Sequence, residues 1–289
     1  MPRKRSTRRR AGKSNRIMKL TMLAALPLVA VSGLATGVSH MMSIPQMDEA
    51  FCYAQNGQSE TAIFIDNSVT PGLSSPQFRD FQTAFMNAWE AAPPNTRFSV
   101  FSTGRSVAGS IARPAFEFCK PASTPAEQDA FGGPDKPAPM LSRIYDDATA
   151  HFEGIVHELI SSSHDPDMQA VDSPILEQLQ AISRYSGFQG PDRRLVVFTD
   201  GIQNTETARF CAVAGDMPSF ETFEQQQRYT FVRPDPLDGS AVDILLTEGL
   251  ITPNSLPYCS EAELRTWWPD YFRANGARTV QLTRLRTNG

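Results

Sequence analysis

The sequence lacks the short motifs that mark several common enzyme classes. It contains no G-x-S-x-G nucleophile elbow and no Walker loop for nucleotide phosphates. His157 is followed by Glu158 but not by the second histidine of a zinc protease helix. We therefore expect neither a serine hydrolase of that type, nor a P-loop nucleotidase, nor a zinc protease. There is also no internal repeat that would indicate a solenoid or a propeller.

Cysteine is scarce, and no two cysteines have the C-x-x-C spacing of a zinc or redox site. An even number of cysteines in an oxidising compartment favours two disulfides. Their order along the chain favours one bond within each pair, although three connectivities remain open, as does a set of four buried thiols. The four candidates are Cys52, Cys119, Cys211 and Cys259.

Acidic residues are absent from residues 1–19, which hold nine of the 27 lysines and arginines. The remaining 18 basic residues face 31 acidic ones, so residues 20–289 carry a net charge of −13. Such an acidic domain argues against nucleic acid as its main partner. The basic segment alone would suit a nucleic-acid arm or a localisation signal, but its position before an apolar stretch favours a membrane role.

Charged residues are also absent from residues 20–38, a stretch of about the length that crosses a bilayer as a helix. The positive-inside rule places the basic tail in the cytoplasm and the rest of the chain outside it. We predict a signal anchor over residues 20–39 and a single-pass protein of the cytoplasmic membrane with a periplasmic or extracytoplasmic domain. Small residues at Ser32, Gly33, Ala35 and Gly37 keep a cleaved signal peptide open as the alternative.

After a linker over residues 40–60, short apolar runs alternate with segments of helical periodicity. We expect strands at 61–65, 98–101, 112–119, 195–198, 242–246 and 279–285, with the third at an edge because of Pro114. We expect helices over 76–93, 140–159, from Ser173 onward, weakly over 219–227, and over 260–275, where Pro269 should kink or split the helix. The proline-rich segment 121–139 reads as a surface loop. The pattern predicts one α/β domain over 61–289, with a doubly wound, mainly parallel sheet flanked by helices.

Two of these strands end in an acidic residue followed by turn-forming residues. Asp66 follows the first strand and leads into Asn67, Ser68 and Thr70, and Asp200 follows the fourth strand between Thr199 and Gly201. Ser173 opens a helix between them. Ligands of open α/β sheets bind at the carboxyl ends of the strands, so these loops are expected to meet at one crevice.

The D-x-S-x-T sequence at Asp66, together with T-D-G at Asp200, resembles the metal-ion-dependent adhesion site of von Willebrand factor A (vWA) domains. The resemblance extends over about residues 60–285, in the family's order of elements, and implies a vWA or Rossmann-like fold. In the family pattern a threonine from a middle loop completes the site. Here that threonine has no direct match, and Ser173 is the candidate, with Asp172 as the alternative.

The resemblance implies a Mg²⁺ site, or one for Mn²⁺ or Ca²⁺, with Ser68, Thr70 and Ser173 as hydroxyl ligands and Asp66 and Asp200 as charge-balancing carboxylates. Mg²⁺ prefers about six oxygen ligands and usually keeps several waters. A cation held largely by neutral hydroxyls stays electrophilic, so an acidic side chain from a partner protein can complete its coordination. Such a site serves binding rather than turnover.

Simpler interpretations and other functions stay open at this point. Asp66 and Asp200 could belong to ordinary turns, and Ser173 could cap its helix with Pro174 at the first helical position. Haloacid dehalogenase-like phosphotransferases also follow the first strand with an aspartate, in D-x-D-x-T, which would make Asp66 a nucleophile. Their second acid is replaced by Ser68, which removes the proton donor. A metal-free envelope scaffold is the third alternative.

Overall fold

The computed structural model describes residues 47–53, 58–66, 73–103, 111–162, 173–210, 217–247 and 260–285, the last three side chains of 111–162 excepted. All of them belong to one compact unit, Gln46–Gly289. The expected anchor at 20–39 and the candidates Ser68, Thr70, Asp172, Cys211 and Cys259 lie outside the described residues. Among the described helices, none combines the length and apolarity needed to cross a membrane.

A six-stranded sheet with the order β3-β2-β1-β4-β5-β6 forms the centre of this unit. All neighbouring strands pair in parallel except β2 and β3, which are antiparallel. The prediction of an α/β domain with a mainly parallel sheet is therefore confirmed, as is the edge position of the third strand. The strands are β1 (Ser59–Ile65), β2 (Arg97–Ser102), β3 (Phe116–Cys119), β4 (Asp192–Thr199), β5 (Ala241–Leu246) and β6 (Thr279–Arg284).

The central strand β1 is buried on both faces, which explains the apolar run over its last four residues, 62–65. Ala62 and Phe64 belong to the hydrophobic core on one face, whereas Ile63 and Ile65 belong to the core on the other. Such a strand is fixed in position by two layers of helices. The residue that follows it is consequently held at a defined place on the sheet edge.

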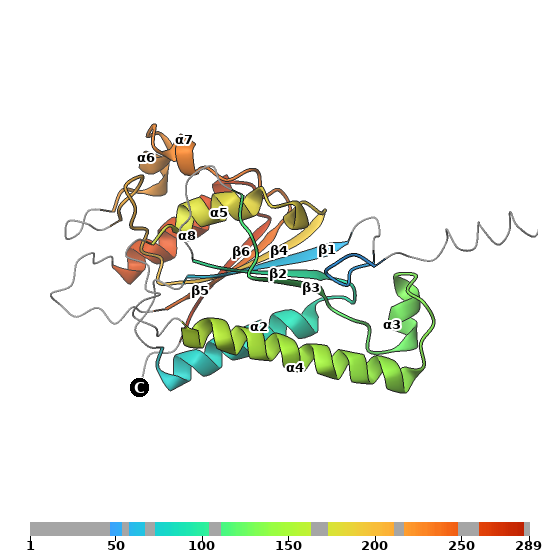
Figure 1. The fold of residues 1–289 in the computed structure, drawn as a ribbon. Coiled ribbons are helices and arrows are strands. Elements are labelled where there is room, and N and C mark those ends of the chain that lie inside the picture. Colours follow the sequence, from blue (N-terminus) through green and yellow to red (C-terminus); the bar gives the residue numbers. More distant parts are fainter. Residues whose placement is uncertain are drawn as a thin grey trace, which may run out of the picture. The chain divides into compact units, whose positions relative to one another are not determined.

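Helices cover both faces of the sheet (Figure 1). On one face lie α2 (Ser75–Ala91) and α4 (Ala138–Ser162), whose Phe85 and Phe152 pack in the same core. On the other face lie α5 (Ile175–Ser183) and α8 (Glu261–Ala274), together with the short helices α6 (Phe220–Glu224) and α7 (Tyr229–Val232). A 3₁₀ turn, η2 (Ser186–Phe188), precedes β4.

One sequence prediction about local structure is wrong, and one of the two alternatives expected at Pro269 is excluded. The expected loop 121–139 contains a short helix, α3 (Pro125–Ala130), because Thr124 caps it and Pro125 occupies its first turn. Helix α8 is not split at Pro269 but runs through it. Pro269 is buried next to Trp268, and the rings of Trp267 and Tyr271 stack at 5.5 Å, so tertiary packing outweighs the lost backbone hydrogen bond.

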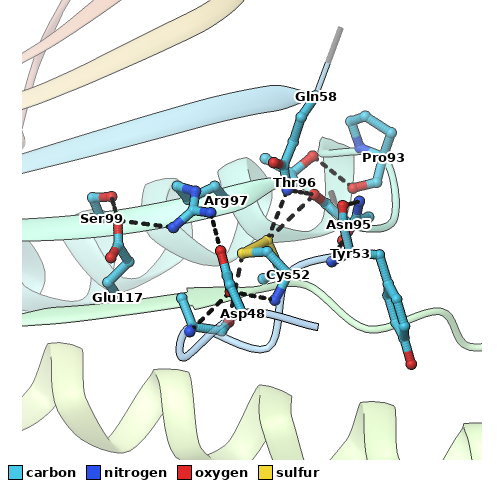
Figure 2. Close-up of a disulfide and its surroundings, with 12 residues drawn as sticks. Asp48, Cys52, Tyr53, Gln58, Pro93, Asn95, Thr96, Arg97, Ser99 and Glu117 are labelled. Atoms are coloured by element: carbon cyan, nitrogen blue, oxygen red, sulfur yellow. Dashed lines mark hydrogen bonds and ion pairs between the residues drawn. A yellow bond between two sulfur atoms is a disulfide. The ribbon is translucent and has the colours of Figure 1, made fainter. Parts of the chain in front are cut away.

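The disulfide between Cys52 and Cys119, one of the expected pairs, is present and fastens residues 47–53 to the edge strand β3 (Figure 2). Asn95 supports the same segment, because its side chain bonds the backbone of Tyr53 twice, at 2.9 and 2.8 Å. Asp48 forms an ion pair with Arg97 at the start of β2. These contacts lie at the amino-terminal edge of the parallel strands, opposite the edge at which Asp66 and Asp200 lie.

Candidate functional site

The strand order reverses between β1 and β4, so the carboxyl ends of these two strands lie at the topological switch point of the sheet. Open α/β sheets bind ligands at this place, in the crevice beyond the strand ends. Asp66 follows β1 directly, and its backbone amide donates to the carbonyl of Phe198 in β4 at 2.8 Å. Asp200 follows β4. The structure therefore brings together two acidic residues that are 134 positions apart in the sequence.

The carboxylate of Asp66 is enclosed by hydroxyl groups from three different segments. Thr199 donates to Oδ2 at 2.7 Å, Ser173 approaches the same oxygen at 3.4 Å, and Thr103 donates to Oδ1 at 3.0 Å. Asp66 is only 1% exposed. A buried carboxylate requires such donors, because an ionised group without hydrogen bonds is costly to remove from water. The interpretation of Asp66 as a plain surface turn does not account for this enclosure.

Ser173 reaches Asp66 because its loop is fastened to the loop that follows β4. The backbones of Ser173 and Asn204 exchange two hydrogen bonds of 3.0 Å, which form an isolated antiparallel bridge. Helix α5 is capped at Pro174, without a side-chain hydrogen bond, so the interpretation of Ser173 as its N-cap is wrong. The hydroxyl of Ser173 points instead to the carboxylate of Asp66.

A buried glutamate holds the two loops in place. The side chain of Gln203 donates to Glu177 at 2.9 Å and accepts from the amide of Leu176 at 2.8 Å. Thr205 donates to the other carboxylate oxygen of Glu177 at 2.8 Å. Because Glu177 and Leu176 belong to α5 and Gln203 to the loop after β4, this network fixes the distance between Ser173 and the end of β4.

Asp200 combines a turn with an unusual electrostatic environment. Its Oδ1 accepts from the amide of Ile202 at 2.8 Å, so the expected turn is present. Burial of its carboxyl group, followed by the negative charge of Asp66, raises the pKa of Asp200 from 3.8 to about 7. The residue as a whole keeps part of its surface accessible. The two carboxyl groups are thus close enough to repel each other, and a cation between them would relieve that repulsion.

Gly201 completes the T-D-G turn for a steric reason. Its φ of +77° lies in the left-handed region, and a β-carbon there would lie 2.8 Å from the indole nitrogen of Trp268. That nitrogen donates to the carbonyl of Gly201 at 3.0 Å. The aromatic core beneath α8 therefore supports the loop that carries Asp200.

Sequence reasoning missed two residues of this cluster, Thr103 and Thr199. Thr199 belongs to the T-D-G motif, and its hydroxyl both donates to Asp66 and accepts from the amide of Gly201 at 2.9 Å. Thr103 follows β2, the other neighbour of β1. The rule that strand ends meet at one edge, applied to β2 as it was to β1 and β4, would have identified Thr103.

The described donors are of the kind that hard divalent cations prefer. They comprise two carboxyl groups and the hydroxyls of Ser173, Thr199 and Thr103, all oxygen ligands suited to Mg²⁺, Mn²⁺ or Ca²⁺. Across the described residues there is no group of three or more histidine, cysteine, aspartate or glutamate side chains that could hold a metal. Within the described residues the cluster thus contains two carboxyl groups and three hydroxyls.

Comparison with known proteins gives no family to which the chain can be assigned. No protein-family model matches the sequence, and no curated protein matches it.

Proposed function

We propose that this domain binds a divalent cation at the switch point between β1 and β4 and uses it to bind an acidic side chain of a protein partner. The observation that carries the proposal is the enclosure of buried Asp66 by hydroxyls from three segments, with Asp200 beside it. Asp66 lies at the usual ligand position of an open α/β sheet. Turn formation alone does not explain why its carboxylate is held by so many hydrogen bonds.

In this proposal Asp66 and Asp200 supply the negative charge and Ser173 supplies the middle-loop hydroxyl. A bound divalent cation supplies a Lewis-acidic centre that accepts a further carboxylate oxygen. Thr199 and Thr103 orient Asp66 through hydrogen bonds, as outer-shell groups do at many metal sites. The partial exposure of Asp200 leaves the site open to a partner on one side.

The resemblance to vWA domains adds Ser68 and Thr70, and keeps Asp172 as the alternative to Ser173. The β3-β2-β1-β4-β5-β6 order and the direct hydrogen bond between Ser173 and Asp66 support this proposal. The charge pattern of residues 1–38 supports a membrane anchor and an extracytoplasmic domain, which is part of the same proposal. Protease added to spheroplasts should cleave the domain, and a domain protected until the membrane is lysed would contradict the location.

The phosphotransferase alternative is disfavoured by the burial of Asp66. A nucleophilic carboxylate must reach the phosphorus atom of its substrate, whereas both oxygens of Asp66 already accept hydroxyl hydrogen bonds and the residue is inaccessible. Hydrolysis of a generic aryl phosphate that is lost in Asp66→Asn would support the enzyme and contradict our proposal.

Calorimetric titration of the purified chain with MgCl₂ and MnCl₂ tests the cation site. We expect binding that weakens by roughly 100-fold in Asp66→Asn, because the substitution removes a charge-balancing carboxylate beside the cation. Asp192→Asn is the matched control, because Asp192 lies exposed at the opposite end of β4 and bonds Ser59 at 2.7 Å. Equal cation affinity in the Asp66 and Asp192 variants, or no cation binding by the wild type, would overturn the proposal.

A further inference from the structure

A pocket lies at the amino-terminal edge of the sheet, away from Asp66 and Asp200. It has a volume of about 240 Å³ and lies among the end of β3, α4 and the segment 47–53. Its lining is mainly apolar and aromatic, and includes Phe51, Tyr53, Phe118, Phe131, Leu141 and Ile144. Apolar walls with a few polar groups are typical of small-molecule sites.

The walls of this pocket are held by covalent and polar contacts. The Cys52–Cys119 disulfide ties one wall to β3, and Asn95 bonds the backbone of Tyr53 on both sides (Figure 2). The ring of Tyr53 stacks on that of Phe131 with centroids 5.5 Å apart. The pocket is thus preformed, so a ligand would not have to pay for ordering these side chains.

Phe51 is an unusual feature of the rim. Its φ of +58° lies in the left-handed region, which bulky residues rarely adopt, and its side chain is 67% exposed. Asp48 stabilises this conformation, because its Oδ1 accepts from the amides of Ala50 and Cys52 at 2.9 Å each. Met47, also on the rim, is 48% exposed. An exposed aromatic ring held in a strained conformation beside a cavity is typical of a functional site.

The charged residues that line this pocket are both lysines. Lys120 is engaged in the fold, because its ammonium donates to the carbonyls of Glu90 and Ala92 at 3.0 and 2.6 Å. Lys136 takes part in no ion pair within the described part of the chain. Asp129 and Asp135 line a separate, neighbouring hollow of about 320 Å³ that also reaches Lys136. The apolar pocket therefore presents positive charge on a domain that is otherwise acidic.

We propose that this pocket binds a medium-chain fatty acid, with the alkyl chain among the aromatic side chains and the carboxylate at Lys136. The pocket volume corresponds to that of about eight water molecules in the liquid, which suits an alkyl chain of about eight carbons. Binding would cover Phe51 and Met47 and so remove exposed apolar surface from water. The positive lining selects an anion over a neutral or cationic amphiphile. This site is independent of the proposed cation site.

Three eight-carbon probes that differ only in the head group test this proposal: octanoate, 1-octanol and octylammonium. Titration followed by ¹H–¹⁵N NMR on the full chain should show octanoate binding at least about fivefold more tightly than octanol, and octylammonium more weakly still. Shifts should include the amides of Phe51 and Ile144. Lys136→Gln should abolish the difference between octanoate and octanol, because it removes the ammonium.

Arg143→Gln is the charge-matched control, since Arg143 is an exposed residue of α4 outside the pocket lining. It should leave the preference for octanoate unchanged. Ile144→Trp should fill the pocket and block all three probes, and Asp66→Asn should leave octanoate binding intact. Equal affinity for the three head groups, an unchanged preference in Lys136→Gln, or no octanoate binding up to about 10 mM would each overturn the proposal.

Discussion

The two edges of the sheet treat carboxylates in opposite ways. At the amino-terminal edge Arg97 lies between Asp48 and Glu117 and forms an ion pair with each (Figure 2). At the carboxyl-terminal edge Asp66 is surrounded by neutral hydroxyls and lies close enough to Asp200 to perturb it. The first arrangement is complete within the protein, whereas the second concentrates like charge, which a bound cation would offset in the proposed function.

The pKa values of Asp48 and Asp200 express this difference. Burial acts to raise the pKa of Asp48, but the amide of Cys52 and the guanidinium of Arg97 outweigh it and hold that pKa below its usual value. For Asp200, burial and the charge of Asp66 act in the same direction and raise the pKa to about 7. Charge neutralised by arginine stabilises a fold, whereas like charge retained at a strand edge indicates a ligand site.

Loss of the disulfide is expected to have the largest effect on stability and none on cation binding. The bond closes a segment of 67 residues, and its removal by Cys52→Ser with Cys119→Ser should lower the free energy of unfolding by about 4 kcal/mol. Urea denaturation measures this loss. If the double variant also loses Mg²⁺ affinity while still folded, the amino-terminal edge affects the proposed cation site at the carboxyl-terminal edge, which would contradict the expectation.

Thr199→Val should cost about 2 kcal/mol, because it removes a hydroxyl that donates to buried Asp66 and accepts from Gly201 while keeping the side-chain shape. Thr266→Val is the control, since Thr266 lies exposed on α8 and donates to the carbonyl of Ala262. Its cost in the same urea experiment should stay below about 0.5 kcal/mol. An equal loss of unfolding free energy in the two variants would show that the Thr199 hydroxyl beside Asp66 contributes no more to stability than an exposed hydroxyl.

At the other edge Arg97→Gln should cost about 1 kcal/mol, because Asp48 and Glu117 lose the cation between them. The effect should shrink in high salt, since Asp48 remains partly exposed. Arg143→Gln removes an exposed i,i+4 pair with Asp147 and should cost about 0.3 kcal/mol. Differential scanning calorimetry at low and high salt measures the stability loss of each variant and its dependence on salt. A larger loss in the Arg143 variant would contradict the account of this edge.

A pH dependence of opposite sign is expected at the two edges. Because the pKa of Asp200 is raised from 3.8 to about 7, the folded, cation-free domain binds more protons than the unfolded chain between these values. Its contribution to the free energy of unfolding should therefore fall as the pH rises from about 4 to about 7. The pKa of Asp48 is lowered, so its stabilisation is present above 3.8 and is lost as the pH falls through its folded pKa.

Urea unfolding in EDTA between pH 5 and pH 8 measures the Asp200 contribution. Asp200→Asn should flatten the plot of unfolding free energy against pH in this range. Arg97→Gln should change that plot only at acidic pH, where Asp48 titrates. A curve that keeps its slope in Asp200→Asn would contradict the assignment of this titration.

Sequence periodicity predicted the sheet well because its central strands are buried on both faces. The runs at residues 62–65 and 195–198 are continuously apolar, and each is followed by a polar residue that marks the edge. Helix α3 was missed because the prolines of 121–139 suggested a loop, although a proline in the first turn is compatible with a helix. The number of prolines in this segment therefore suggested the wrong structure, because the position of Pro125 in the first turn of α3 permits a helix.

The candidate site could be predicted only in part. Asp66, Ser173 and Asp200 were found from their places at strand and helix ends, and the structure brings all three together. The ion pair between Asp48 and Arg97 joins residues 49 positions apart, and no local pattern encodes such a contact. Ser68 and Thr70 lie outside the described residues, so their roles as ligands stay predictions.

Crystals soaked in Mn²⁺ and measured at an X-ray energy where manganese scatters anomalously test the cation site most directly. We expect one strong anomalous peak among Asp66, Ser173 and Asp200, with oxygen ligands about 2.2 Å away. The peak should be absent from Asp66→Asn crystals soaked in the same way. A map with no peak at this edge, or with its strongest peak beside Asp48 and Glu117, would contradict the proposal.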